Sequence, residues 1–193
     1  DQALVTDTLR NTLGYSAAET SALYGQYTFG MTLFQLPPSF IYPVSVSLMP
    51  AITAALTRQD RQAAGSAAGA ALKLTTLAAL PAGAGLSVLA EPILLLLYPA
   101  VPDTARAAAY HLTFLGLACV FVCLMVATNG VLQSYGRPYV PVLTLLCGGV
   151  MKIVTNYLMV GDPATGIRGA AVSTLYCYAL IVVLNLLAIA RYV

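Results

Sequence analysis

Apolar runs of about 20 residues recur along this chain, and a helix of that length crosses the hydrocarbon core of a bilayer. Short polar or charged connections separate the runs. Only 8% of the residues are charged and 59% are hydrophobic, whereas a soluble domain has roughly 25% charged residues. The mean hydropathy of +0.82 agrees with this composition. We therefore predict an all-α fold, a polytopic bundle of transmembrane helices.

Five spans are expected, at about 23–56, 66–90, 105–132, 140–160 and 169–190. They form a single partial transmembrane domain over 1–193, in which 1–22 is an extramembrane connector with a turn at 14–16. A tight connection at Asp162 and Pro163 separates the last two spans. The chain begins at Asp1 without a Met or a signal-peptide pattern, so we expect its natural N-terminus to be missing.

Helix-breaking residues mark the first two spans. The first is expected to bend and to face the protein interior, because a helix break in a membrane needs protein or a water-filled cavity beside it. Its prolines are Pro37, Pro38, Pro43 and Pro50. In the second span, Gly65 and Gly69 are spaced to let a neighbouring helix approach closely, and Pro81 predicts a kink.

The basic residues predict the orientation in the membrane. One side collects Arg58, Arg61, Arg137 and Arg191, with Lys73 near its edge, and the other collects Arg10, Arg106 and Arg168. The first set is predicted to be cytoplasmic, because positive residues favour that side. A net charge of +2 scattered over loops argues against a nucleic-acid partner, so membrane lipids are the expected surroundings.

No motif of a soluble enzyme is present, and no cofactor or metal is predicted. The four cysteines lie in apolar runs, where Cys packs as a small hydrophobe: Cys119, Cys123, Cys147 and Cys177. We expect His111 to be an interfacial residue in water, close to Asp103 and Arg106. Glu91 is either a coupling carboxylate for a proton or cation, or an interfacial, solvated group at a helix end.

Polar residues recur at helical spacing on three spans. The stripes are Thr144, Gly148, Lys152 and Asn156 on the fourth; Thr28, Thr32, Gln35 and Ser39 on the first; and Met125, Asn129 and Gln133 on the third. Singly, each stripe fits hydrogen bonding between helices. Together they favour a polar cavity, with Lys152, Asn156, Gln35, Asn129, Thr32 and Ser39 as its predicted lining.

Lys152 is the most informative residue, because a Lys at the centre of a membrane helix costs roughly 2.5 to 3.5 kcal/mol. One interpretation is a functional group inside a cavity. The other is a structural Lys that reaches the interface or pairs with a carbonyl. Neutral donors with one Lys suit an anionic, hydroxyl-rich ligand, such as a phosphate-linked sugar, better than a bare cation.

Several strings in this order resemble the stage V sporulation protein B type of polysaccharide exporter, in the multidrug/oligosaccharidyl-lipid/polysaccharide (MOP) flippase superfamily. They are GYSAAE (14–19), QLPP (35–38), VSLMPAI (46–52), LAEPI (89–93), GVLQSYGRP (130–138), KIVTNYL (152–158) and GIRGAA (166–171). Gln35 departs from the pattern, since the family more usually has Asn there. The resemblance implies a two-lobe transporter of the bacterial cytoplasmic membrane, of which this chain is part of the second lobe.

The resemblance also implies a function. The intact protein is expected to flip or export a lipid-linked oligosaccharide or a cell-envelope polysaccharide precursor by alternating access, with the missing first lobe as a partner. This piece alone should not transport. One rival is a cation-coupled multidrug antiporter of the same superfamily, which would need carboxylates within the membrane. The other is a membrane assembly protein without transport activity, in which the polar stripes close into helix contacts.

Overall fold

The computed structural model describes residues 2–11, 14–161 and 166–192, and its regular structure is entirely helical there. Within these residues, five stretches are long and apolar enough to cross a membrane: Ala17–Thr57, Arg61–Val88, Pro102–Ser134, Tyr139–Val160 and Arg168–Tyr192. The predicted all-α bundle with five candidate spans is confirmed. The helices are α1 (Gln2–Asn11), α2 (Ala17–Phe34), α3 (Leu36–Thr57), α4 (Arg61–Val88), α5 (Ala90–Leu97), α6 (Pro102–Ser134), α7 (Tyr139–Val160) and α8 (Arg168–Tyr192).

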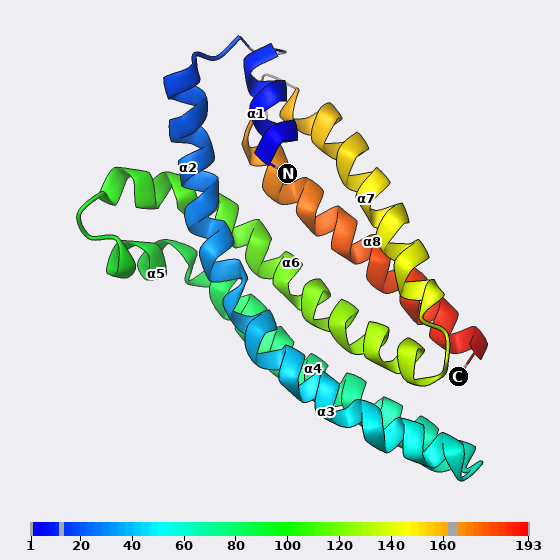
Figure 1. The fold of residues 1–193 in the computed structure, drawn as a ribbon. Coiled ribbons are helices and arrows are strands. Elements are labelled where there is room, and N and C mark those ends of the chain that lie inside the picture. The colour runs from blue at the N-terminus through cyan, green and yellow to red at the C-terminus, as the bar shows by residue number, and fades with distance from the viewer. Residues whose placement is uncertain (1, 12–13, 162–165, 193) are drawn as a thin grey trace.

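Helix α6 forms the centre of the bundle. Helices α2, α3, α4, α5 and α8 all pack against it, and α7 is held mainly by α8 (Figure 1). In α6, 67% of the most apolar window is buried, whereas the other candidate spans reach at most 33%. A helix that is apolar on every side is suited to such a central position, because it has no face to turn toward water.

Helices α4 and α6 cross at two glycines. A Cβ atom added to Gly83 would lie 2.7 Å from the carbonyl oxygen of Gly116, and one added to Gly116 would lie 2.6 Å from the backbone nitrogen of Ser87. The Ser87 hydroxyl also donates to the carbonyl oxygen of Thr113. Small residues thus bring two backbones together at this point, as they do in many membrane helix pairs.

The close approach predicted at Gly65 and Gly69 is wrong. Nothing lies within 4 Å of a Cβ atom added at either position. The buried face of α4 passes instead through Ala64 and Ala68, one residue earlier in each case, so the two glycines turn away from the neighbouring helices. Pro81 lies inside α4, and the helix continues past it to Val88.

The first apolar stretch is divided at Gln35 rather than running as one bent helix. Gln35 is both the last cap of α2 and the first of α3, and a proline stands in the first turn of α3. Proline is tolerated there because the backbone N–H that it lacks would have no partner within the helix. Pro43 and Pro50 lie inside α3 without ending it. Figure 1 shows the change of direction between α2 and α3.

The N-terminal connector is more structured than expected. Helix α1 occupies part of it, and α2 begins at Ala17, inside the range 1–22 assigned to the connector. The turn at 14–16 is present, with Gly14 at φ +72°. Ser16 then caps α2, since its hydroxyl accepts from the backbone N–H of Glu19 and its own N–H donates to the Glu19 carboxylate. The connection expected at Asp162 and Pro163 lies outside the described residues.

Candidate functional site: polar residues between the helices

The polar stripe of α7 faces α8 in an antiparallel register. On α8, four residues at the same four-residue spacing face the stripe. The facing pairs are Thr144–Asn185, Gly148–Ile181, Lys152–Cys177 and Asn156–Ser173. Thr144, Gly148 and Asn156 are buried, so the stripe points away from lipid as its spacing indicates. Two of its polar side chains, Thr144 and Asn156, therefore form hydrogen bonds that join α7 to α8.

Lys152 is partly buried on this seam. It lies close enough to Cys177 of α8 to interact with it electrostatically. Neither α7 nor α8 contains an aspartate or a glutamate. The side chain is therefore in the interior of the bundle near its most polar seam, and both interpretations of Lys152 stay open.

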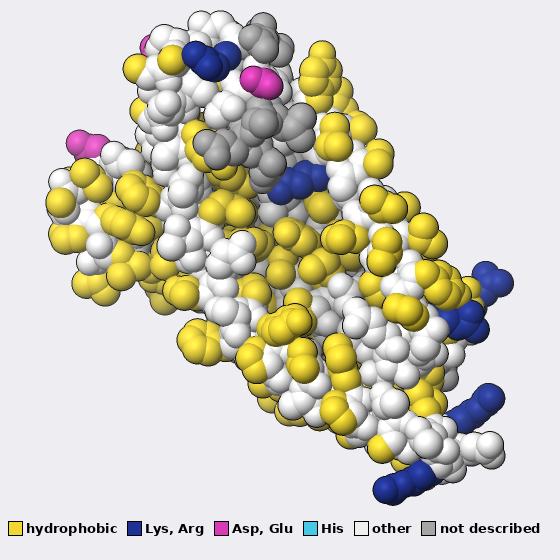
Figure 2. All heavy atoms as spheres, viewed as in Figure 1, with side chains coloured by type: hydrophobic (Ala, Val, Ile, Leu, Met, Phe, Trp, Pro, Cys, Tyr) yellow, Lys and Arg dark blue, Asp and Glu magenta, His cyan; other side chains and the backbone are white. Residues whose placement is uncertain are grey.

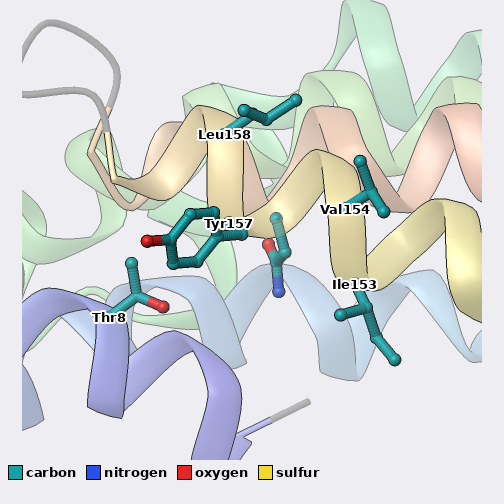
Figure 3. Close-up of a pocket in the computed structure, with 6 residues that line it drawn as sticks. Thr8, Ile153, Val154, Tyr157 and Leu158 are labelled. Carbon is teal, nitrogen blue, oxygen red and sulfur yellow. The ribbon is translucent and has the colours of Figure 1, made fainter.

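Asn156 combines burial with an unused donor. The side chain is 3% exposed, and its Oδ1 accepts a hydrogen bond of 3.0 Å from the Ser173 hydroxyl. In the described part of the chain its Nδ2 has no hydrogen-bond partner. Asn156 also lines a pocket of about 290 Å³ between α1 and α7, where Thr8 lies beside Tyr157 (Figure 3). The rest of that lining is mainly apolar.

Asn129 lies in a different place. With Gln133 and Met125 of α6 and Tyr42, Val46 and Met49 of α3, it lines a pocket of about 240 Å³. Its Oδ1 accepts a hydrogen bond of 2.8 Å from Nδ2 of Asn185. The α6 stripe thus lines a pocket between α3 and α6, and Asn129 also joins it to α8.

The stripe of α2 and α3 is uncovered. Thr28, Thr32, Gln35 and Ser39 are all exposed. The hydroxyls donate to carbonyl oxygens of their own helices, at 2.9 Å for Thr28, 3.0 Å for Thr32 and 2.7 Å for Ser39. The amide of Gln35 has no hydrogen-bond partner among the described residues, and Gln35 stands at the helix break near the middle of Ala17–Thr57.

Asn185, which was not among the residues predicted to line a cavity, is the centre of a buried network. Its Nδ2 donates to Thr128 (3.0 Å) and Asn129 (2.8 Å), and its Oδ1 accepts from the hydroxyl of Thr144 (2.7 Å). One side chain thereby links α6, α7 and α8. The repeat of Ser173, Cys177, Ile181 and Asn185 at four-residue spacing was the available signal, but its two middle members are apolar.

The expectation for His111 is wrong. Its side chain is 2% exposed, and its ring packs edge-on against Tyr27 of α2 at 5.8 Å and Tyr110 at 6.0 Å. Five residues separate His111 from Arg106, which places them on different faces of α6. His111 therefore turns toward α2, whereas Arg106 turns toward α5.

Glu91 lies at the start of α5, at one end of the bundle. Its carboxylate is 3.7 Å from the guanidinium of Arg106, and the two side chains are 57% and 61% exposed. Arg106 is also 3.8 Å from Asp103. This exposed cluster fits an interfacial, solvated carboxylate better than a group buried for ion coupling.

The predicted lining residues therefore occupy four places. Asn156 and Asn129 line separate pockets, Lys152 lies on the α7–α8 seam, and Gln35, Thr32 and Ser39 share an open face of α2 and α3. The shared element is α8, which bonds to both asparagines. The contacts of α8 with Asn156, Asn129 and Thr144 are hydrogen bonds between helices. The polar face of α2 and α3 is instead exposed, and no described helix covers it.

Known proteins resemble most of this chain. A sequence model of the family described as MatE matches residues 20–158. The "Uncharacterized membrane protein YabM" of Bacillus subtilis (strain 168) is 29% identical over 173 residues, which cover 90% of this chain and 31% of that protein. A solved structure described as the inward-facing conformation of a multidrug resistance MATE family transporter of the MOP superfamily has a TM-score of 0.77 and 17% identity. That match covers 96% of this chain and 40% of the other, so this chain spans less than half of either protein.

Proposed function

Because this chain belongs to the MatE family, we propose that it forms part of the second lobe of a membrane transporter. In this proposal the intact protein moves a lipid-linked oligosaccharide or a cell-envelope polysaccharide precursor across the bacterial cytoplasmic membrane. It does so by rocking one lobe against the other around a central cavity. The 193 residues form a single partial transmembrane domain of that protein.

The exposed amide of Gln35 is the observation that carries the proposal. Gln35 interrupts a 41-residue apolar stretch near its midpoint, and its side chain has no hydrogen-bond partner in the described part of the chain. Lipid offers no hydrogen bonds at that depth, and broken helices persist in membranes only against protein or a water-filled cavity. A cavity shared with the other lobe would satisfy both the amide and the break. Thr32 and Ser39 would line the same cavity.

The chemistry of the open face favours an uncharged or anionic, hydroxyl-rich cargo. Hydroxyls and an amide both donate and accept hydrogen bonds, which is what recognition of a sugar requires. Acidic residues in the five candidate spans stand only in the first turns, as Glu19 and Asp103. The second candidate is a cation-coupled multidrug antiporter, and the structural neighbour is described as a multidrug resistance transporter. Such an antiporter would need buried carboxylates.

Water accessibility tests the position of Gln35. In the full-length protein, with the exposed Cys147 changed to Ala, a Gln35→Cys variant should react in intact cells with a membrane-impermeant maleimide. Leu146→Cys is the matched control, because Leu146 is 62% exposed on an apolar face of α7 and should stay unlabelled in lipid. A Gln35→Cys variant that labels no better than Leu146→Cys would contradict the cavity.

A flipping assay tests the cargo. Proteoliposomes of the full-length protein should flip a fluorescent lipid-linked oligosaccharide, and Gln35→Leu should reduce the rate while Gln35→Asn, which keeps the amide, should retain it. Lys152→Ala and Asn156→Ala test the remaining site residues. Transport of a cationic dye with an imposed proton or sodium gradient, without flipping, would favour the antiporter.

Orientation is the last part of the proposal. We place the loops with Arg58, Arg61 and Arg137 in the cytoplasm, which the excess of basic residues on that side supports. An epitope inserted in the loop at 58–60 should then be reached by antibody only after permeabilisation. Detection in intact cells would invert the assignment.

A further inference from the structure

Four arginines lie at one end of the bundle, and none of them forms an ion pair with a described carboxylate. Arg58 and Arg61 flank the turn between α3 and α4, Arg137 lies between α6 and α7, and Arg191 is in the last turn of α8. Figure 2 shows basic side chains without acidic ones at this end of the visible face, whereas the acidic side chains lie at the other end together with further basic ones. Both ion pairs found among the described residues belong to Arg106, in the opposite end.

Among the residues that the structure describes, one carboxylate lies at this end, and it has another role. Asp60 lies between Arg58 and Arg61 in sequence, and its Oδ1 accepts a hydrogen bond of 2.9 Å from the backbone N–H of Ala63. It therefore caps the start of α4. Four guanidinium groups with a single carboxylate leave an excess of positive charge at this end, and positive charge held in one place favours an anion.

Two of the guanidinium groups are held beside one aromatic ring. The Cζ atom of Arg137 lies 4.6 Å from the centre of the Tyr192 ring, and that of Arg191 lies 5.9 Å from it. Nη1 of Arg137 also donates a hydrogen bond of 2.8 Å to the hydroxyl of Tyr139. Stacking on a ring orients a guanidinium and leaves its edge free to bind a phosphate through two hydrogen bonds.

The same tyrosine borders two hollows. A pocket of about 170 Å³ is lined by Leu56, Arg61, Tyr135 and Tyr192. A groove of about 470 Å³ follows α7 and α8 from Arg191 and Tyr192 into the span; its further lining includes Leu143, Cys147, Leu184, Leu187 and Ala188. Because Tyr192 lines both, the pocket that contains Arg61 adjoins an apolar groove between two membrane helices, and Arg137 and Arg191 lie beside the ring that the two hollows share.

We propose that this end of the bundle binds an anionic membrane phospholipid. Its phosphate headgroup contacts the guanidinium groups of Arg61, Arg137 and Arg191, and one acyl chain lies in the groove of α7 and α8. Basic pockets between transmembrane helices bind lipid headgroups through this combination of charge and aligned donors. Leu143 and Leu187 are 56% and 63% exposed in the groove, so a chain in the bilayer reaches them directly.

A bilayer lipid fits both hollows better than a soluble anion, because a soluble anion has no use for the apolar groove. The site lies on the outside of α7 and α8, apart from the open face of α2 and α3 where we place the cargo. It therefore goes beyond the proposed transport function and does not depend on it.

Native mass spectrometry of the full-length protein in detergent tests the site. Dioleoylphosphatidylglycerol should bind more tightly than dioleoylphosphatidylcholine. Each arginine near an anionic surface contributes about fivefold in affinity, so the double variant Arg137→Gln/Arg191→Gln should bind the anionic lipid about 25-fold more weakly. Arg168→Gln is the matched control, because Arg168 also stacks on a tyrosine, Tyr110 at 4.8 Å, but away from the site. It should keep the wild-type affinity.

Two further arms separate the parts of the site. Ala188→Phe fills the groove and should weaken binding of both lipids, with the arginines untouched. Inorganic phosphate and glycerol phosphate should compete poorly with the anionic lipid. Equal binding of the two lipids, equal loss in Arg168→Gln, no effect of Ala188→Phe, or displacement by inorganic phosphate at matched concentration would each overturn the proposal.

Discussion

Replacing Asn185 should loosen the packing of α6, α7 and α8 by a predictable amount. The side chain is fully buried and makes three hydrogen bonds, to Thr128, Asn129 and Thr144. Hydrogen bonds between membrane helices contribute about 0.6 kcal/mol each on average, so Asn185→Leu, which keeps the number and branching of the side-chain heavy atoms, should lower the free energy of unfolding by about 2 kcal/mol through the lost hydrogen bonds. The loss should not exceed about 5 kcal/mol, the sum of three bonds at the measured maximum of about 1.7 kcal/mol.

The partners of Asn185 explain why the lower value is expected. The hydroxyl of Thr144 also bonds to the carbonyl oxygen of Pro141, and that of Thr128 bonds to the carbonyl oxygens of Leu124 and Met125. These threonines keep a partner after the substitution. Asn129 loses the donor from Asn185 but lines a pocket of about 240 Å³, which is large enough for water to replace it.

Equilibrium unfolding in mixed micelles with dodecyl sulfate, followed by far-UV circular dichroism, measures the effect. Thr155→Val is the matched control, because the Thr155 hydroxyl bonds only within its own helix, to Met151 and Lys152. Its free energy of unfolding should change by less than about 0.5 kcal/mol. Combining Asn185→Leu with Thr144→Val should give a coupling free energy of about 0.6 kcal/mol. The role of the network would be refuted if Asn185→Leu left the free energy of unfolding unchanged. It would also be refuted if Asn185→Leu and the control Thr155→Val lowered that free energy equally.

Three smaller predictions use the same unfolding assay. Gly116→Ala should destabilise by about 1 to 3 kcal/mol, because the new Cβ atom would press on backbone atoms, whereas Gly65→Ala should be neutral or stabilising; equal effects would contradict the helix crossing. Ser16→Ala removes the cap of α2 and should cost about 1 kcal/mol, with Ser21→Ala, whose hydroxyl bonds only within the helix, near zero. Glu91→Gln breaks an exposed ion pair and should cost less than about 1 kcal/mol while leaving the pH dependence of transport unchanged; a shifted pH profile would restore the coupling role.

The spans and the α7 stripe were accessible from sequence because each depends on local spacing. A run of apolar residues predicts a span whatever surrounds it, and residues four apart share a helix face in any fold. The helix break was anticipated only in outline. Any of four prolines could have ended the helix. The break lies at Gln35 because Pro37 and Pro38 stand in the first turn of α3, whereas Pro43 and Pro50 lie inside α3 without ending it.

Contacts between helices were less accessible. Whether His111 or Arg106 faces a neighbouring helix depends on how α6 is rotated about its own axis relative to α2 and α5. The spacing of residues in the sequence does not predict that rotation. The same holds for Gly65, which lies beside the buried alanines of α4 but not among them. The side of α8 that faces α7 was not predicted from sequence, because the apolar Cys177 and Ile181 stand between the polar Ser173 and Asn185. The residues predicted to line one cavity therefore lie in two pockets, on a packed seam and on an open face.

The combined length of α2 and α3 has a mechanical consequence. At 1.5 Å per residue, 41 residues extend about 60 Å, twice the roughly 30 Å of a hydrocarbon core. Two helices of this combined length would extend past a bilayer even with the change of direction at Gln35. Figure 1 shows the turn between α3 and α4 reaching beyond the turn between α6 and α7. The tip of that turn would then stand in water, with Arg61 behind it at the level of the headgroups, so a soluble partner or an engineered tag could bind the lobe at the tip without entering the membrane.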